Sequence, residues 1–244
     1  MPTGIIINSS AILLGGLLGA LLGHHIPERI RTTLSVIFGL CSMGMGIVYI
    51  ANINTLPAVI LAVIIGVVIG ELLFLEKQIA SGIGKIRGPL EKILKSDNHG
   101  NDDTEEFMNS FISVVVLFCA SGTGIFGAIE SGMSGDHTVL IAKAILDFFT
   151  AMTFAIKLGP LVAFIAVPQV IIMLTLFFSS GLIHPATNEL MRLDFTACGG
   201  ILMLATGFRI SGIKHFPIAN MIPAMILVMP FSYLWTAYIV PLLS

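Results

Sequence analysis

The sequence predicts an all-α membrane protein, a polytopic bundle of about eight transmembrane helices. Three observations support this fold class: the composition, a series of apolar segments of membrane-spanning length, and an uneven distribution of Lys and Arg between the connections. The chain of 244 residues is 56% hydrophobic and 11% charged, with a mean hydropathy of +0.99. A soluble domain has about 25% charged residues. A water-soluble core would not bury this much apolar surface, so the bilayer is the expected solvent.

Eight apolar segments are each near the ~20 residues that an α-helix needs to cross the hydrocarbon layer. The fifth segment is the least regular, because it contains Lys143 and Asp147. An even number of spans places both termini on the same side of the membrane. The expected helices of this single membrane domain cover residues 5–22, 33–51, 57–75, 109–128, 138–156, 160–181, 194–210 and 217–242.

The twelve Lys and Arg residues are distributed unevenly between the two sides of this bundle. Arg192 lies in a connection on one side, and Lys143 lies inside a span. The others all lie on the opposite side, which we predict to be cytoplasmic because cytoplasmic loops are enriched in Lys and Arg. Both termini are then outside. The cytoplasmic set is Arg29, Arg31, Lys77, Lys85, Arg87, Lys92, Lys95, Lys157, Arg209 and Lys214.

A long polar connection divides the chain into a three-helix part at 1–75 and a five-helix part at 109–244. We predict that residues 76–108 form a cytoplasmic amphipathic helix and then an acidic linker, at 96–106. In the helix, Lys and Arg alternate with apolar residues at helical spacing, which is typical of a helix lying in the headgroup plane. The apolar positions are Ile79, Ile83, Ile86, Leu90, Ile93 and Leu94.

Two pairs of segments are similar to each other. Residues 34–47 align with 112–125, and residues 46–61 align with 212–227. The second alignment relates spans two and three to spans seven and eight, which have opposite orientations in the predicted topology. Inverted repeats of this kind are typical of many transporter folds, whose sites lie near the repeat interface. The alternative is chance similarity between apolar segments of low complexity.

Lys143 and Asp147 are the strongest candidates for a functional site. They stand four residues apart on one face of the fifth span, so they can form an ion pair. Charged side chains within a membrane span are unfavourable and usually mark a function. We predict a polar pathway in which Asp147 is a cation or proton site and Lys143 is its counter-ion. The alternative is a structural pair whose lysine extends to the outer interface.

A glycine-rich, acidic stretch at 127–137 precedes this pair. If it re-enters the membrane, Glu130 and Asp136 would form an acidic entrance to the pathway. Non-helical backbone at membrane depth is tolerated only beside protein or water, so such a loop would line the pathway. The alternative is an ordinary external turn.

The same stretch contains Gly132-Met133-Ser134-Gly135, which matches the GxSG motif of rhomboid intramembrane proteases. Those enzymes pair the serine with a histidine on another helix. No predicted span has a histidine near its middle, and His137 adjoins the loop itself. The motif is therefore a weak indication of an enzyme.

Two further polar residues are assigned to the pathway. Thr123 lies between Gly122 and Gly124, which indicates a flexible or broken helix. Gln169 follows Pro168 in the sixth span, where proline frees a carbonyl and kinks a helix. A broken helix lining a cavity and a simple kink, with Gln169 bonded to a neighbouring helix, are both compatible with this pattern.

Glycines recur at four-residue spacing in two spans, where they allow helices to pack closely in lipid. We expect a chain of this size to form a homo-oligomer, with these glycine faces as candidate contacts. The glycines are Gly15, Gly16, Gly19 and Gly23 in the first span and Gly66 and Gly70 in the third.

These residues resemble the YqgA/YdfK-type family of bacterial membrane proteins, a domain of unknown function. The resemblance extends over essentially the whole chain, and the run from Gly135-Asp136 through Lys143 to Leu146-Asp147 is its most specific part. It implies a polytopic protein of the bacterial inner membrane and brings no established activity. Supporting positions are Gly127–Asp136, Leu140, Gly23–Arg29, Gly70-Glu71, Gly199-Gly200 and Asn220–Ala224.

The predicted function is a small inner-membrane transporter or channel for an ion or a small polar solute. The predicted pathway contains Lys143, Asp147, Glu130, Asp136, Gln169 and Thr123. No catalytic residue, metal or cofactor is predicted, and the expected partners are the bilayer, the solute and further copies of the chain, without nucleic acid. The alternatives are an intramembrane enzyme acting at residues 132–137, and a non-transporting scaffold or sensor that uses the amphipathic segment.

Overall fold

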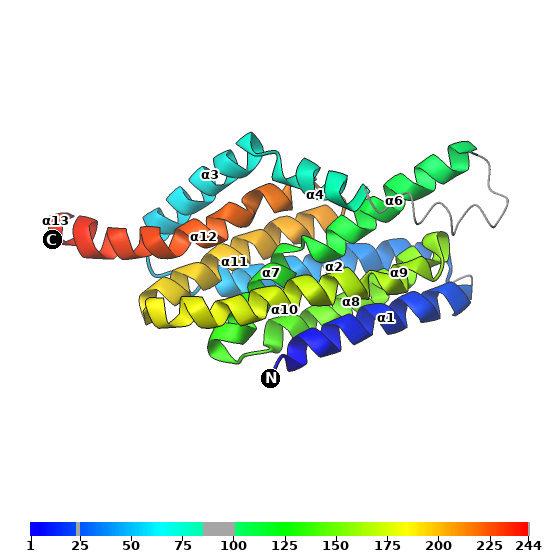
Figure 1. Cartoon of the computed structure of the whole chain (residues 1–244), viewed down its shortest axis with the longest axis horizontal. Coiled ribbons are helices and arrows are strands. Elements are labelled where there is room, and N and C mark those ends of the chain that lie inside the picture. The colour runs from blue at the N-terminus through cyan, green and yellow to red at the C-terminus, as the bar shows by residue number, and fades with distance from the viewer. Residues whose placement is uncertain (23–24, 85–100, 244) are drawn as a thin grey trace.

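The structure is a computed structural model and describes residues 1–22, 25–84 and 101–243, which form a bundle of helices without strands (Figure 1). The all-α prediction is confirmed. The helices are α1 (Thr3–Leu22), α2 (Glu28–Ile50), α3 (Leu56–Leu72), α4 (Leu75–Gly84), α6 (Asn101–Cys119), α7 (Gly122–Ser134), α8 (Thr138–Leu158), α9 (Leu161–Phe164), α10 (Ala166–Ile183), η2 (His184–Ala186), α11 (Glu189–Ile210), α12 (Ile218–Leu234), η3 (Trp235–Ile239) and α13 (Val240–Leu243).

Within the described residues, seven helices are long and apolar enough to cross a membrane. An eighth candidate is the pair of α3 and the first part of α4, which are bent by 50° relative to each other. Large apolar side chains cover the outside of the bundle; Leu14, Ile64, Ile171 and Ile226 are each more than half exposed. An apolar exterior of this extent suits a lipid environment and not water. The prediction of about eight membrane helices is confirmed by the length and apolar composition of these seven or eight helices.

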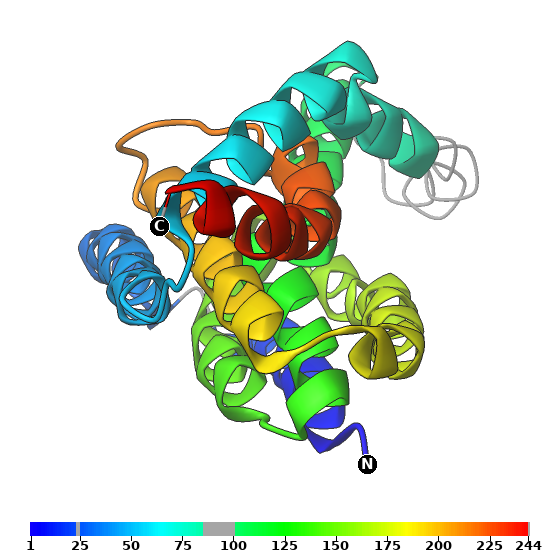
Figure 2. The same ribbon diagram turned by 90° about the vertical axis from the view of Figure 1, so that its left-hand side faces the viewer.

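The core lies between α7, α11, α12 and α3, which contribute most of the largest cluster of buried apolar residues. Viewed along the bundle (Figure 2), α7 and α11 lie near the centre, with α2 on one side and α10 on the other. Phe126 of α7 and Phe195 of α11 meet there with ring centroids 5.7 Å apart.

The segment around the expected fourth span differs most from the prediction. Helix α6 begins at Asn101, so residues 101–106 are helical and not part of a linker, while 96–100 lie outside the described residues. The acidic residues that indicated a linker also suit the first turn of a helix, because the helix dipole favours negative charge there. The chain then breaks at Ala120-Ser121 and continues as α7, which confirms the broken helix indicated at Gly122–Gly124.

Residues 127–134 are therefore helical. The sequence left open a re-entrant loop and an external turn for this stretch, and its non-helical backbone is confined to residues 135–137. Ile125, Ile129 and Met133 recur at four-residue spacing and are all buried in the core, and this burial stabilises a helix despite its glycines. Only Gly135, Asp136 and His137 connect α7 to α8. Gly135 has a φ of 75°, a left-handed conformation that glycine adopts readily at the end of a helix.

The predicted amphipathic helix begins as α4, where Ile79 packs into a small cluster with residues of α6 and α12. Its remaining apolar positions from Ile86 onward lie outside the described residues. The amide oxygen of Asn220 on α12 accepts a hydrogen bond of 2.8 Å from the backbone N–H of Glu76. Glu76 also forms an ion pair of 2.9 Å with Arg209, so α4 is fixed to the end of the bundle.

Helix α2 packs antiparallel on α11, and α3 packs antiparallel on α12. The first pair meets at glycines: a Cβ atom on Gly46 would lie 2.6 Å from the carbonyl oxygen of Gly200, and one on Gly200 would lie 2.6 Å from that of Gly46. The second internal alignment, of 46–61 with 212–227, relates the end of α2 and the start of α3 to the loop after α11 and the first part of α12. It therefore pairs α3 with α12 and does not include α11, and the inverted repeat stays a prediction. The first alignment, of 34–47 with 112–125, relates segments of different structure. Residues 34–47 lie within the continuous helix α2, whereas residues 112–125 contain the break between α6 and α7.

The glycine faces proposed as oligomer contacts are occupied within the described part of the chain, from which Gly23 is missing. Gly15 and Gly19 approach the backbone of α8 at Phe148 and Met152. Gly66 and Gly70 approach α12 in the same way. These glycines therefore join helices of one chain, and a partner copy would need another surface.

Candidate functional site

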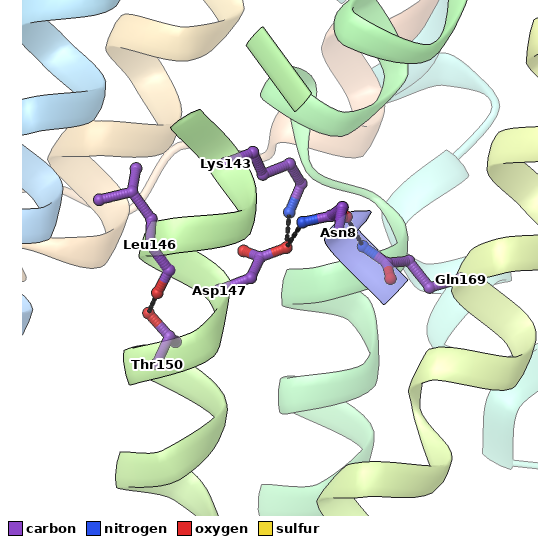
Figure 3. Close-up of polar contacts among 6 residues, drawn as sticks. All are labelled: Asn8, Lys143, Leu146, Asp147, Thr150 and Gln169. Carbon is purple, nitrogen blue, oxygen red and sulfur yellow. Dashed lines mark hydrogen bonds and ion pairs between the residues drawn. The ribbon is translucent and has the colours of Figure 1, made fainter. Parts of the chain in front are cut away.

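Lys143 and Asp147 form a buried ion pair on α8 (Figure 3). Lys143 is 3% exposed and Asp147 is 8% exposed. The ammonium group also lies 5.9 Å from the ring centroid of Phe118 on α6, a distance at which an aromatic face attracts a cation. The pair faces the interior of the bundle, so the alternative of a lysine that extends to the outer interface is wrong.

Two amide side chains from distant helices complete this polar cluster (Figure 3). Asn8 of α1 donates from Nδ2 to Oδ2 of Asp147 over 2.8 Å. Gln169 of α10 donates from Nε2 to Oδ1 of Asn8 over 2.7 Å. Both amides are fully buried, and Oε1 of Gln169 has no hydrogen-bond partner in the described part of the chain. A continuous hydrogen-bonded path thus joins α10, α1 and α8.

The break between α6 and α7 lies beside this cluster. A helix end leaves backbone N–H or C=O groups without intrahelical partners, and here both ends are buried. Between them and α8 is a cavity of about 20 Å³, which has room for about one water molecule. Its lining is Ser42, Leu117, Phe118, Ser121, Thr123, Lys143, Leu146, Asp147, Thr150, Thr206 and Ile210.

Pro168 acts differently from the prediction of a mid-span kink. It lies in the first turn of α10, which begins at Ala166, and there its missing N–H removes no intrahelical bond. The interruption is three residues earlier, at Ile165 between α9 and α10. This short break and the α6–α7 break both lie next to α1 and α8, so two interrupted helices border the polar cluster.

Four of the six predicted pathway residues are brought together: Lys143, Asp147, Gln169 and Thr123. The other two lie apart, toward the α7–α8 connection. Glu130 is on α7, and Asp136 is exposed in the turn, where Oδ1 accepts hydrogen bonds from the backbone N–H (2.8 Å) and hydroxyl (2.6 Å) of Thr138. These bonds lower the pKa of Asp136 below its ordinary value.

The serine of the protease-like motif is engaged in the local turn. Its hydroxyl, on Ser134, donates to the Glu130 carbonyl over 2.9 Å and accepts from the Asp136 N–H over 3.1 Å. The neighbouring histidine, His137, instead forms a hydrogen bond of 2.6 Å with buried Ser131. The motif serine and the loop histidine therefore do not form a nucleophile–base pair.

Asn8 and Asp194 are among the buried polar residues that sequence reasoning missed. Asn8 stands out as an amide in an otherwise apolar stretch, a signal that could have been used. Asp194 is fully buried on α11, and its Oδ1 accepts from the backbone N–H groups of Asn54 (2.9 Å) and Thr55 (2.6 Å) at the start of α3. Its Oδ2 accepts from Ser232 over 2.6 Å, so Asp194 holds three helices together and is a structural residue.

Comparison with known protein families shows which family the sequence belongs to. Residues 3–233 match the family described as "Protein of unknown function (DUF554)". The chain belongs to the DUF554 family. This confirms the resemblance seen in the sequence. One relative is named as a membrane protein, in keeping with the apolar helices of this chain.

Two curated relatives of this DUF554 chain match it over nearly its full length. It is 50% identical over 238 residues to "Uncharacterized protein YqgA" of Escherichia coli (strain K12), covering 98% of this chain and 99% of the relative. It is 24% identical over 228 residues to "Uncharacterized membrane protein YdfK" of Bacillus subtilis (strain 168), covering 92% of this chain and 93% of the relative. No solved structure matches the chain.

Proposed function

We propose that this DUF554 protein moves a small ion or polar solute across the bacterial inner membrane, along a pathway that passes the Asp147 carboxylate. The observation that carries the proposal is the buried cluster of Lys143, Asp147, Asn8 and Gln169. Burying an ion pair is unfavourable unless its geometry and further hydrogen bonds compensate. Within a membrane such groups usually line a substrate or ion pathway.

The interrupted helices support the same conclusion. Broken helices at membrane depth occur where they are buried in protein or line a water-filled cavity, and in many transporters they form the binding site. Here the α6–α7 break borders the hydroxyl-lined cavity beside Asp147. A purely structural ion pair would require neither the cavity nor the break.

The proposed orientation follows from the charges at the helix ends. Arg29 and Arg31 at the start of α2, Lys157 at the end of α8 and Arg209 at the end of α11 would face the cytoplasm, since cytoplasmic ends are enriched in Lys and Arg. Both termini would then be outside. We also propose a homo-oligomer, joined through surfaces other than the glycine faces that pack within the chain.

Solute flux into proteoliposomes tests this function. Purified protein is reconstituted and screened with protons, alkali cations, halides and small organic acids. Three proteins are compared: wild type, Asp147→Asn, and Glu189→Gln as a control. Glu189 is exposed in the first turn of α11 and lies outside the cluster. The substitution at Asp147 removes one charge and leaves the size and part of the hydrogen bonding of the side chain unchanged.

We expect at least one solute to enter with wild type and Glu189→Gln, and to enter at the rate of empty vesicles with Asp147→Asn. Folding of each variant is checked by gel filtration and thermal unfolding before reconstitution. If folded wild type moves none of these solutes, the proposal is wrong. If Asp147→Asn moves the solute as fast as wild type, the pathway does not pass this carboxylate.

A further inference from the structure

We infer that an apolar groove between α10 and α12 binds a membrane phospholipid, with one acyl chain lying along the groove and the phosphate near Arg192. This lipid site goes beyond the proposed transport and does not depend on it. The inference is derived from the continuity and apolar lining of the groove, from its dimensions, and from the charge at one of its ends.

The groove lies between α10 and α12, which both pack on α7 more than on each other (Figure 2). Its wide part, of about 640 Å³, is at the end of the bundle near Tyr233, and its narrow part, of about 290 Å³, reaches Ile79 of α4. The two parts are continuous, because Ile125, Leu176 and Ile222 line both. The wide part alone is within the roughly 300–1,000 Å³ of typical ligand sites.

Hydrocarbon is the chemistry that this lining accepts. The narrow part is lined by apolar side chains and the thiol of Cys119, and the wide part has polar side chains only at Thr187 and Tyr233, at one end. The groove opens beside Leu182 and Ile226, which are both largely exposed on the exterior of the bundle. A polar occupant would lose its hydrogen bonds along most of this length. The occupant is therefore an apolar chain from the surrounding bilayer.

The dimensions of the groove suit a single chain and not a helix. Its lining on α10 runs from Pro168 to Leu182, which is a length of about 21 Å along a helix. One leaflet of the hydrocarbon layer is about 15 Å deep, so an extended acyl chain reaches from one end into the narrow part. One turn of an α-helix with its side chains occupies roughly 400–600 Å³, more than the narrow part contains. The groove thus excludes a helix of a second copy along its full length.

The charge at the wide end complements a phosphate. Arg192 of α11 reaches back to this end, where its guanidinium donates to the carbonyl of Thr187 over 3.4 Å. A guanidinium has five N–H donors and binds phosphate well, and this one long bond leaves donors available. The charge of Glu130 also acts on Arg192, but among the described residues the two form no ion pair. Tyr233 is half exposed here, and tyrosine is enriched at the level of lipid headgroups.

The narrow part lies over the break between α6 and α7, on residues that lipid outside the groove does not reach. Cys119 and Ala120, the last residues before the break, line it together with Ile125. Each of the three is less than a tenth exposed. A lipid chain that contacts them must therefore lie within the groove, which makes them reporters of this site.

Photolabelling in vesicles of phosphatidylethanolamine and phosphatidylglycerol tests the site. The vesicles contain the full-length protein and, at a low mole fraction, a phosphatidylglycerol probe with a diazirine near the end of one acyl chain. Labelled residues are identified by mass spectrometry of peptides. The comparison is between wild type, Leu176→Trp, which fills the groove where its two parts meet, and Ile171→Trp as a matched control. Ile171 is on the same helix, more than half exposed, and lies outside the lining.

We expect adducts on Cys119, Ala120 and Ile125 in wild type and in Ile171→Trp. Each methylene group that is kept out of the groove lowers the affinity for the chain about fourfold. Leu176→Trp should therefore reduce these adducts about tenfold or more. Adducts confined to residues on the exterior of the bundle in wild type would overturn the inference, because the surrounding lipid produces them without a groove site.

Because Leu176→Trp could fail to fold, Arg192→Gln provides a second test at the other end of the groove. Loss of this cation should reduce the adducts about fivefold, whereas Arg29→Gln, which removes an exposed cation at the start of α2, should leave them unchanged. Equal labelling of wild type and Arg192→Gln contradicts the phosphate contact and overturns the inference. If the probe does not label the groove and Leu176→Cys forms a covalent dimer on oxidation, a second copy occupies the groove and the inference is wrong.

Discussion

Asn8 of α1 donates a hydrogen bond of 2.8 Å to the carboxylate of Asp147 on α8, a residue 139 positions later in the chain. The same amide accepts a hydrogen bond from Gln169. Asn8 is thus the link between the ion pair and the third helix of the cluster. Its bond to Oδ2 fixes the orientation of the carboxylate.

Replacing Asn8 by Ala should destabilise the protein by about 1–3 kcal/mol, because buried donors and acceptors on Gln169 and Asp147 lose their partner. It should also reduce flux, since the carboxylate is no longer oriented. The measurement is the unfolding free energy in detergent, with Asn52→Ala as the control, because Asn52 is exposed and its side chain donates to the carbonyl of Val48 one turn earlier. Equal stability of the two variants would contradict the buried bond.

The close crossing of α2 and α11 makes a second prediction. Gly46→Ala places a Cβ atom 2.6 Å from the Gly200 carbonyl oxygen, so the helices must separate, at about 1–3 kcal/mol of destabilisation. Gly44→Ala on the same helix has nothing within 4 Å of its Cβ and should be neutral or stabilising by up to ~1 kcal/mol. Thermal unfolding of both variants checks this difference. An equal loss of stability in Gly44→Ala and Gly46→Ala would exclude the close contact between α2 and α11.

Asp194 should be important for stability and not for transport. Asp194→Ala removes the acceptor for the N–H groups of Asn54 and Thr55 and for Ser232, and we expect a loss of about 2–3 kcal/mol. Asp194→Asn retains one carbonyl acceptor and should lose about half as much. Unfolding free energies in detergent, together with flux per folded molecule, test both parts. A flux defect in a fully stable Asp194→Asn protein would assign this residue to the pathway instead.

The turn before α8 predicts a small dependence of stability on pH. Hydrogen bonds from Thr138 lower the pKa of Asp136 in the folded protein below its ordinary value of 3.8. A depressed pKa contributes stability above the unfolded-state pKa, and this contribution disappears as pH falls through the folded-state pKa. Because Asp136 is exposed, the effect should be about 0.5 kcal/mol or less.

Asp136→Asn removes the titrating group and keeps an acceptor for Thr138. The difference in unfolding free energy between wild type and Asp136→Asn should therefore shrink as the pH is lowered below 3.8. A difference that grows on acidification would mean that the carboxylate is destabilising in the folded state.

Lys143 and Asp147 could be predicted as a pair from the sequence because both charges lie in an apolar segment, four residues apart on one helix. Their partners could not be identified in this way. Asn8 and Gln169 lie on other helices, and only the packing of α1 against α8 and α10 brings them to the carboxylate. Local spacing carries no information on such distant contacts.

Helix ends were harder to predict than helix existence. Charge suggested a linker before the fourth span, although acidic residues also favour the start of a helix, as at Asn101. Glycines suggested a loop at 127–134, but burial of Ile129 and Met133 outweighs their helix propensity. The α3–α12 pairing was better indicated, because the internal alignment related residues 56–61 of α3 to residues 222–227 of α12, and these two helices pack together.

The most direct test of the central claim is one ratio: the initial flux through reconstituted Asp147→Asn divided by that through wild type, for the solute that wild type moves best. Both are normalised to folded protein in the vesicles. If the pathway passes this carboxylate, the flux through Asp147→Asn should fall to the flux into empty vesicles. A ratio near one would show that the buried Lys143–Asp147 pair is structural.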